Sequence, residues 1–339
     1  MSSSTLLQRF EQGDIRALSR IISYVENEDN GYLELLSYLY RKPRHAVRIG
    51  LTGPPGAGKS TLVDGVSRLL LEAGNDVSVI AVDPSSPFTG GALLGDRVRF
   101  KEETQGGRHY FRSLASRGSS GGLSRATDNV ALTLDGFGFD FALIETVGVG
   151  QVELDIVDNC DIVVVVLVPE SGDTVQTLKA GLTEIADIFV VNKSDRAGAD
   201  RIVTDLTTML ALRRSQGTHP TVSQSASHSD SQSAGETQTI PVIATDAVHG
   251  TNLTELVDTF NSLLKIRKAN GDFEARRRRQ MKRKVSQLLQ RRFLSETLQK
   301  VASKGEVDSA IESILVGEDD PYSTADRLFE RINLARQSC

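Results

Sequence analysis

Gly53-Pro-Pro-Gly-Ala-Gly58-Lys59-Ser60-Thr61 follows directly on the apolar run Ala46–Thr52, and this junction decides the fold. The residues fit the pattern G-x-x-x-x-G-K-[ST], in which glycines let the backbone wrap so that its N–H groups face phosphate oxygens. The helix expected next adds its positive end, Lys59 adds a point charge, and Ser60 offers a hydroxyl to Mg²⁺. The residues expected to contact phosphate or its metal are Gly53, Pro54, Pro55, Gly56, Ala57, Gly58, Lys59, Ser60 and Thr61.

Six short β-branched or apolar runs recur along the chain, separated by segments long enough for helices. They are Ala46–Thr52, Val77–Asp83, Phe139–Glu145, Ile162–Val168, Ile188–Asn192 and Ile240–Ala244. Runs that are apolar on both faces are typical of strands covered by helices on both sides, and this alternation indicates a mostly parallel sheet. The predicted fold class is therefore α/β, a P-loop NTPase with a mostly parallel, doubly wound sheet.

Helical segments are expected before the sheet. Apolar residues recur near helical spacing between Leu6 and Val25, and a second amphipathic stretch runs from Leu33 to Leu39. The pattern predicts an all-helical N-terminal region over residues 1–44.

The nucleotide-binding domain is expected over residues 45–268, and a charged helical arm over residues 269–339. Within the domain, residues 215–238 include seven Ser and four Gln, a composition that predicts a mobile surface insertion, with a phosphorylated or partner-binding loop as the alternative. The arm holds seven basic residues between Arg276 and Lys284 beside an apolar stripe. Packing on a partner subunit is favoured there over a nucleic-acid patch, because interleaved aromatic residues are absent.

Composition excludes several classes of protein. With 39 Lys and Arg against 44 Asp and Glu, the 339 residues carry a net charge of −5, which gives no global attraction to nucleic acid or anionic membrane. Two cysteines, Cys160 and Cys339, cannot build a disulfide framework or a four-ligand zinc site. The aliphatic run Ile162–Val168 is too short to cross a membrane, and no secretory signal is evident, so we expect a cytoplasmic protein.

Asn192-Lys193-Ser194-Asp195, at the end of a predicted strand, indicates which base is bound. The carboxylate of Asp195 can accept hydrogen bonds from the N1–H and the exocyclic amine of guanine. Adenine presents an acceptor at N1 and would leave that charge unpaired, a mismatch that gives strong discrimination in buried sites. Together with the phosphate loop, this pattern predicts that GTP or GDP is bound.

Acidic residues at other strand ends are candidates for Mg²⁺. Glu145 and Gly148 occupy the place where phosphate-loop enzymes set an acidic residue and a glycine that senses the γ-phosphate. Asp83 closes the second predicted strand, and Asp96 lies in a Gly-rich segment. Because Mg²⁺ keeps several waters and takes few carboxylates, we expect one or two of Asp83, Asp96 and Glu145 near the metal, together with Ser60.

From Val47 through Arg201 the chain resembles the methylmalonyl-CoA mutase-associated GTPases, the MeaB or ArgK group within the metallochaperone-related G proteins. The blocks that carry the resemblance are Val82–Arg97, Arg112–Gly118 with Gly121–Leu123, Glu145–Gln151, Ser171–Gly181 and Asn192–Asp200. The resemblance implies a homodimer with helical extensions. It also implies a GTP-hydrolysing chaperone that gates loading of an adenosylcobalamin-dependent acyl-CoA mutase and protects or reactivates that enzyme.

The resemblance also implies three switch segments and a second base-contacting loop. The switches would be Asp83–Arg97, Glu145–Gln151 and Ser171–Lys179, with Lys179 assisting hydrolysis. The loop would be Asp246-Ala247-Val248, which departs from the usual Ser-Ala start of the family. Residues 215–238 are a further departure, because the family normally has a shorter connection there.

Other functions stay open at this stage. A nickel or cobalt metallochaperone GTPase would need clustered soft or imidazole ligands, whereas the five histidines are scattered along the chain. A nucleotide-dependent regulatory subunit of an amino-acid transport system is suggested by the older transport-related label of the family. An RNA-binding G protein would have to rely on the basic residues between Arg276 and Lys284.

Overall fold

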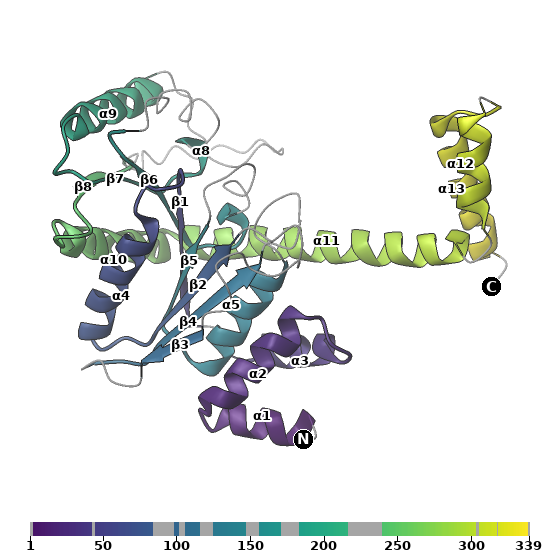
Figure 1. The fold of residues 1–339 in the computed structure, drawn as a ribbon, viewed down its shortest axis with the longest axis horizontal. Coiled ribbons are helices and arrows are strands. Elements are labelled where there is room, and N and C mark those ends of the chain that lie inside the picture. The colour runs from purple at the N-terminus through teal and green to yellow at the C-terminus, as the bar shows by residue number, and fades with distance from the viewer. Residues whose placement is uncertain are drawn as a thin grey trace. The chain divides into compact units, whose positions relative to one another are not determined.

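The chain divides into two compact units, Met1–Phe273 and Glu274–Cys339, and each is described by itself. The first unit holds the sheet and the helices that cover it, and the second holds most of a long helix and two shorter ones (Figure 1). The computed structural model describes residues 3–42, 45–83, 98–101, 106–115, 125–146, 156–170, 183–215, 239–302, 305–316 and 318–337.

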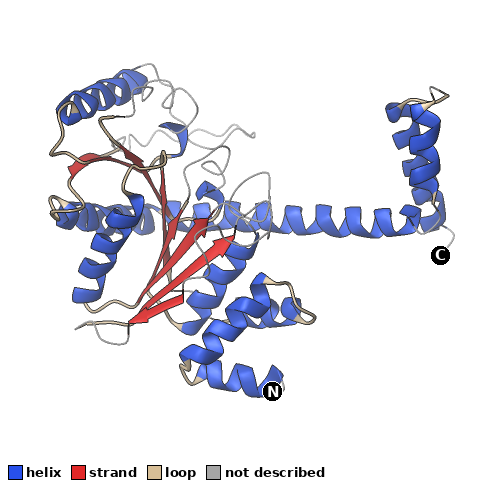
Figure 2. Ribbon diagram, in the orientation of Figure 1, coloured by secondary structure: helices blue, strands red, loops and turns tan. Residues whose placement is uncertain are grey.

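An eight-stranded sheet forms the centre of the described part of the first unit (Figure 2). In order across the sheet the strands are β3 (Val98–Lys101), β4 (His109–Ala115), β2 (Val77–Asp83), β5 (Phe141–Glu145), β1 (Val47–Thr52), β6 (Ile162–Leu167), β7 (Ile188–Asn192) and β8 (Val242–Thr245). Only the edge strand β3 is antiparallel to its neighbour among these pairings. In such sheets ligands bind beyond the carboxyl ends of the strands, where the strand order reverses.

Helices cover both faces of the sheet. One face packs on α4 (Lys59–Glu72) and α10 (Leu253–Asn270). The other packs on α1 (Ser3–Glu11), α2 (Ile15–Glu26), α3 (Tyr32–Tyr40), α5 (Arg125–Phe137), the turn η1 (Ile156–Asp158), α8 (Thr183–Ile185) and α9 (Ala199–Ser215).

Strand β6 shows why the sequence folds this way. All six of its residues are buried, and they alternate between the two cores. Val164 and Val166 pack with the helices α4 and α10, whereas Val163 and Val165 pack with the opposite layer. A continuous β-branched run therefore buries both of its faces, as a central parallel strand must.

The N-terminal helices belong to the core of the first unit. Asp14 caps α2 by accepting hydrogen bonds from the backbone N–H groups of Arg16 (2.8 Å) and Ala17 (3.3 Å). The ring of Phe10 meets that of Phe137 on α5 edge-on, with the centroids 5.1 Å apart. The predicted helical extension is therefore present and rests on the layer of α5.

A buried ion pair joins these helices to the sheet. Arg112 on β4 donates to Glu26 on α2 at 2.8 Å, and both side chains are less than a tenth exposed. Beside it the hydroxyls of Tyr110 and Ser19 lie 3.3 Å apart. Because a single buried charge is costly, the two partners must be present together.

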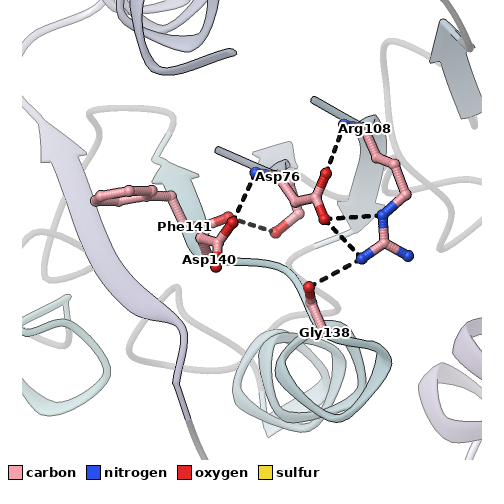
Figure 3. A network of polar contacts seen from close by, with 6 residues as sticks. Asp76, Arg108, Gly138, Asp140 and Phe141 are labelled. Atoms are coloured by element: carbon pink, nitrogen blue, oxygen red, sulfur yellow. Dashed lines mark hydrogen bonds and ion pairs between the residues drawn. The ribbon is translucent and has the colours of Figure 1, made fainter. Parts of the chain in front are cut away.

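A clamp of polar contacts closes the amino ends of β2, β4 and β5 (Figure 3). The guanidinium of Arg108 donates to one carboxylate oxygen of Asp76 through Nε (2.9 Å) and a terminal nitrogen (2.7 Å), and to the carbonyl of Gly138 (2.9 Å). The backbone N–H of Asp76 donates in turn to Asp140 (2.8 Å). This clamp lies at the end of the strands opposite the phosphate loop.

The six predicted runs are all strands, with small shifts at their ends. Phe139–Glu145 begins as a strand at Phe141, and Ile240–Ala244 is replaced by Val242–Thr245. Strands β3 and β4 were not predicted. In β4 the polar residues His109, Arg112 and Ser113 interrupt the apolar pattern, and Arg112 is buried only because its partner comes from a distant helix.

The second unit is helical as far as it is described. Helices α11 (Asp272–Ala302), α12 (Glu306–Leu315) and α13 (Pro321–Gln337) make it up. Asp320 accepts hydrogen bonds from the backbone N–H groups of Tyr322 (2.8 Å) and Ser323 (3.0 Å) and so caps α13, and Phe293 contacts Phe329. The proposed boundaries 1–44, 45–268 and 269–339 remain predictions, and residues 216–238 lie outside the described part of the chain.

Candidate functional site

The loop between β1 and α4 has a backbone that only glycine can follow at two positions. Gly53 has φ 137°, and a Cβ added there would lie 2.0 Å from the carbonyl oxygen of Val166 on β6. Gly58 has φ 83°, and its Cβ would lie 2.4 Å from Nδ2 of Asn192 on β7. The glycines therefore let the loop lie directly against the ends of two neighbouring strands.

The ammonium group of Lys59 lies inside this loop. Lys59 is only 5% exposed, and its Nζ donates to the carbonyl oxygens of Gly53 (2.8 Å) and Pro54 (2.9 Å). Helix α4 begins at the same residue, with the N–H of Leu62 bonded to the carbonyl of Gly58 (2.9 Å). A positive charge and a helix N-terminus thus converge on one loop, which is the arrangement that binds phosphate.

The end of β5 meets the start of α4. The hydroxyl of Ser60 donates to Oε1 of Glu145 at 2.5 Å. Next to it the hydroxyl of Thr146 donates to that of Thr52 at 3.0 Å, which ties the end of β5 to the end of β1. Ser60 and Glu145 therefore present hard oxygen atoms side by side, and these are the ligands that Mg²⁺ prefers.

Asn192 connects the phosphate loop to the loop after β8. Its side chain is buried, and its Nδ2 donates to the carbonyl of Ala57 at 2.8 Å. Its Oδ1 accepts from the hydroxyl of Thr245 (3.2 Å) and from the N–H of Ala247 (3.1 Å). The side chain of Asn192 thus holds the phosphate loop and the segment Asp246-Ala247-Val248 next to each other. These two segments were predicted from separate parts of the sequence.

Asp246 organises the loop that follows β8. Its Oδ1 accepts from the backbone N–H groups of Val248 (3.0 Å) and His249 (3.2 Å), and its Oδ2 lies 2.5 Å from Nδ1 of His249. The hydrogen bond from His249 lowers the pKa of Asp246. The hydrogen bond to Asp246, and then the charges of Asp246 and Asp195, raise the pKa of His249.

Asp195 lies in the turn that follows β7. The preceding Lys193 has φ 59°, and the N–H of Ser194 donates to the carbonyl of Thr245 at 3.0 Å, so this turn is held against the end of β8. The side chain of Asp195 is exposed. Its charge contributes to raising the pKa of His249.

Four of the expected site residues are described only in part or not at all. Asp83 is the last residue of β2, but its side chain is not among those described. Asp96, Gly148 and Lys179 lie outside the described residues, so their expected roles stay predictions. Pro55, Gly56, Ser60 and Thr61 are exposed along the phosphate loop and the first turn of α4, and Val248 is exposed in the loop after β8.

The doubly wound sheet and the loop around Lys59 define a P-loop nucleotide-binding protein. A comparison with known families is more specific: the family described as methylmalonyl Co-A mutase-associated GTPase MeaB matches residues 18–302. The chain belongs to this family and is a GTPase.

Individual relatives agree with this assignment. The chain is 40% identical to a protein of Pyrococcus horikoshii over 96% of this chain and 97% of that protein. It is 35% identical to the mitochondrial methylmalonic aciduria type A homolog of Mus musculus over 84% of this chain and 65% of that protein. The crystal structure of a LAO/AO transport system kinase covers 98% of this chain and 99% of its own, with a TM-score of 0.68 and 21% identity, and supports the fold.

Three contributors to the site were missed at the level of sequence. Thr52 is predicted only as the end of a strand and Thr146 only as part of the segment Glu145–Gln151, whereas in the structure their hydroxyls join β1 to β5. The sequence predicts no role for His249 beyond that of one of five scattered histidines. Its position three residues after Asp246 was an available signal, because an aspartate that caps a turn brings the residue at that spacing close to its carboxylate.

Proposed function

We propose that this GTPase is a chaperone that gates the loading of an adenosylcobalamin-dependent acyl-CoA mutase, of the methylmalonyl-CoA mutase type, and protects or reactivates it. The match to the mutase-associated family over residues 18–302 is the observation that carries the proposal. The relationship to the mouse methylmalonic aciduria type A homolog supports it. The segments that contact the γ-phosphate would differ between the GTP-bound and GDP-bound protein, and the mutase would respond to that difference.

The phosphate end of the nucleotide would be held by residues of β1, α4 and β5. Lys59 neutralises the β- and γ-phosphates together with the N–H groups of the loop, and phosphoryl transfer needs this charge and positioning more than covalent chemistry. Ser60 and Glu145 would hold Mg²⁺, directly or through water, and their adjoining oxygen atoms fit that ion. When bound, Mg²⁺ supplies positive charge to the phosphate oxygens.

The base end would be read by the turn after β7 and the loop after β8. Asp195 would accept from the N1–H and amine of guanine, with Asn192, Lys193 and the segment Asp246-Ala247-Val248 completing the base pocket. The hydrogen bonds of Asn192 to both Ala57 and Ala247 support a single site. A lone carboxylate at this position would make the site select GTP over ATP.

Slow intrinsic hydrolysis that rises with the mutase is the expected behaviour, with Lys179 assisting hydrolysis once the partner is bound. GTP turnover is measured with and without the cognate mutase, and Lys59→Ala serves as the inactive control. We expect turnover to rise with mutase in the wild type and to stay near zero in Lys59→Ala. Unchanged wild-type turnover would remove partner activation from the proposal.

Recruitment of the partner can be tested separately from turnover. Co-purification of mutase subunits from the native cell, in the presence of a non-hydrolysable GTP analogue, should depend on the nucleotide. Asp195→Asn is a matched control, because it keeps the size of the side chain and weakens guanine binding. Recovery of equal amounts of mutase with and without the analogue would contradict nucleotide gating.

We further propose that the chain forms a homodimer through α11. Large apolar side chains recur at helical spacing along this helix and are exposed: Val285 (48%), Leu288 (44%), Leu289 (64%) and Phe293 (39%). An exposed apolar stripe of this kind is typical of a helix that packs on another subunit. The double substitution Leu288→Lys and Leu289→Lys should convert a dimer to a monomer in light scattering, whereas Arg291→Lys should not.

The other candidate functions receive less support. A metallochaperone needs a cluster of ligands, and no group of three or more His, Cys, Asp or Glu side chains that could hold a metal is found among the described residues. Within the same residues no helix is long and apolar enough to cross a membrane. The cytoplasmic location expected from the sequence stays a proposal, and we propose neither nucleic acid nor membrane as a partner.

A further inference from the structure

The loop from Asp246 to Thr251 is closed at its base and braced from within. The N–H of Asp246 donates to the carbonyl of Thr251 (3.3 Å), and the N–H of Thr251 returns a bond to the carbonyl of Asp246 (3.0 Å). Inside the loop the carboxylate of Asp246 accepts from the N–H groups of Val248 and His249. The carboxylate of Asp246 therefore adds side-chain support to a loop whose base is closed by backbone hydrogen bonds.

The carboxylate of Asp246 is nearly buried, and the imidazole of His249 lies against it. Its side chain is 9% exposed, whereas the imidazole of His249, 2.5 Å away, is 72% exposed. The charged groups that act on the imidazole are Asp246 of its own loop and Asp195 of the turn after β7. A buried carboxylate without a counter-charge is costly, and a second carboxylate nearby increases the cost.

We infer that His249 is a positioning residue of the base site, whose imidazolium offsets the charge of Asp246 and so holds the loop, with Ala247 docked on Asn192, beside Asp195. The inference rests on the proposed role of Asp195 as the residue that reads guanine. An uncharged residue at position 246 would need no cation, whereas the carboxylate of Asp246 is a second negative charge that acts on His249 besides Asp195.

The inference predicts that guanine affinity depends on pH. Because the two carboxylates raise the pKa of His249 above its usual value, the imidazolium is fully present in mildly acidic solution and is lost as the pH rises through the raised value. Without the cation the carboxylate of Asp246 loses its charge partner, and the loop is held less firmly. The dissociation constant for GDP should then increase by up to about fivefold, which corresponds to the strength of one exposed ion pair.

The experiment measures GDP affinity of the full chain between about pH 5.5 and 8.5 by competition with a fluorescent guanine nucleotide. The variants are His249→Gln, Asp246→Ser and the two combined. His45→Gln is the matched control, because His45 contacts Asp135 through its backbone N–H, away from this loop. Since the terminal phosphate of GDP itself titrates near pH ~6, each variant is compared with wild type at the same pH.

Rescue separates positioning from a general loss of structure. We expect His249→Gln to bind GDP at low pH as weakly as wild type does at high pH. Relative to wild type, the affinity of this variant should show no change that follows the titration of His249. Asp246→Ser, alone or added to His249→Gln, should restore tight binding at all pH values, because serine can still cap the turn and carries no charge. His45→Gln should keep the wild-type profile.

Two results overturn the inference in distinguishable ways. If wild type prefers guanine to adenine but shares its pH profile with His249→Gln, the role of His249 is wrong and the base assignment stands. If wild type shows no guanine preference at any pH, the proposed role of Asp195 is wrong, and the role of His249 is refuted with it.

Discussion

Replacing Asn192 by alanine should separate the two halves of the nucleotide site. The side chain is 2% exposed and makes three hydrogen bonds, to the carbonyl of Ala57, the hydroxyl of Thr245 and the N–H of Ala247. Each such bond contributes about 0.5–1.5 kcal/mol net, so the three together are worth about 1.5–4.5 kcal/mol. Part of this free energy is lost from the stability of the folded protein, and the rest is lost from the contacts that hold the two loops in place before nucleotide binds.

The share that falls on the loops appears as weaker binding. If about 1.5–3 kcal/mol must be recovered by the nucleotide when it orders both loops, the dissociation constant for GDP increases roughly ten- to hundredfold. Urea unfolding measures the stability of each variant, and fluorescence titration measures its affinity for GDP. Asn192→Asp should lose nearly as much affinity, because it keeps the acceptor oxygen but loses the donor that reaches Ala57.

Asn75→Ala is the control for a lost amide. Nδ2 of Asn75 donates to the carbonyl of Leu70 at 2.9 Å, at the far end of α4 from the phosphate loop. This variant should lose about 1 kcal/mol of stability and none of its affinity. The reasoning is refuted if Asn192→Ala folds and binds GDP within twofold of wild type.

Three further outcomes are expected. Arg112→Met should lower the free energy of unfolding in urea by about 3–5 kcal/mol, because Glu26 is left buried and charged. Adding Glu26→Leu to the same chain should recover most of this loss. If the losses of the two single variants instead add up in the double variant, the two residues do not act as a pair. Arg108→Lys should lose about 1 kcal/mol with unchanged GDP affinity, since lysine cannot make the forked contact to Asp76. His249→Gln should lower the melting temperature most near pH ~6 and not near pH ~9. The pKa of His249 is raised in the folded protein, so its ion pair adds stability at low pH that is lost as the pH rises. A difference in melting temperature that does not depend on pH would exclude the ion pair.

Local patterns were sufficient to predict the central part of the fold. The junction of Ala46–Thr52 with the glycine-rich loop predicts strand, turn and helix, because Gly53 (φ 137°) and Gly58 (φ 83°) take backbone conformations that residues with a Cβ rarely adopt. Runs such as Ile162–Leu167 contain no polar residue, and this is the pattern of a strand that is buried on both faces. These features depend on neighbours in sequence or on burial alone.

Features that depend on distant partners were not predictable in this way. Strand β4 contains Arg112, which is compatible with a buried strand only because Glu26 neutralises it, and that contact crosses 86 positions of the chain. The bridge from Asn192 to Ala57 crosses 135 positions. Sequence spacing predicted that both segments serve one nucleotide, but not which side chain joins them.

The nucleotide selectivity of Asp195→Asn shows whether the phosphate loop and the turn after β7 bind opposite ends of one guanine nucleotide. Affinities for GTP, ATP and XTP are measured for wild type and for the variant by the same competition assay. We expect wild type to prefer GTP strongly, and we expect Asp195→Asn to lose this preference and to gain affinity for XTP, whose C2 oxygen can accept a hydrogen bond from the amide. Undiminished GTP selectivity in the variant would contradict this arrangement.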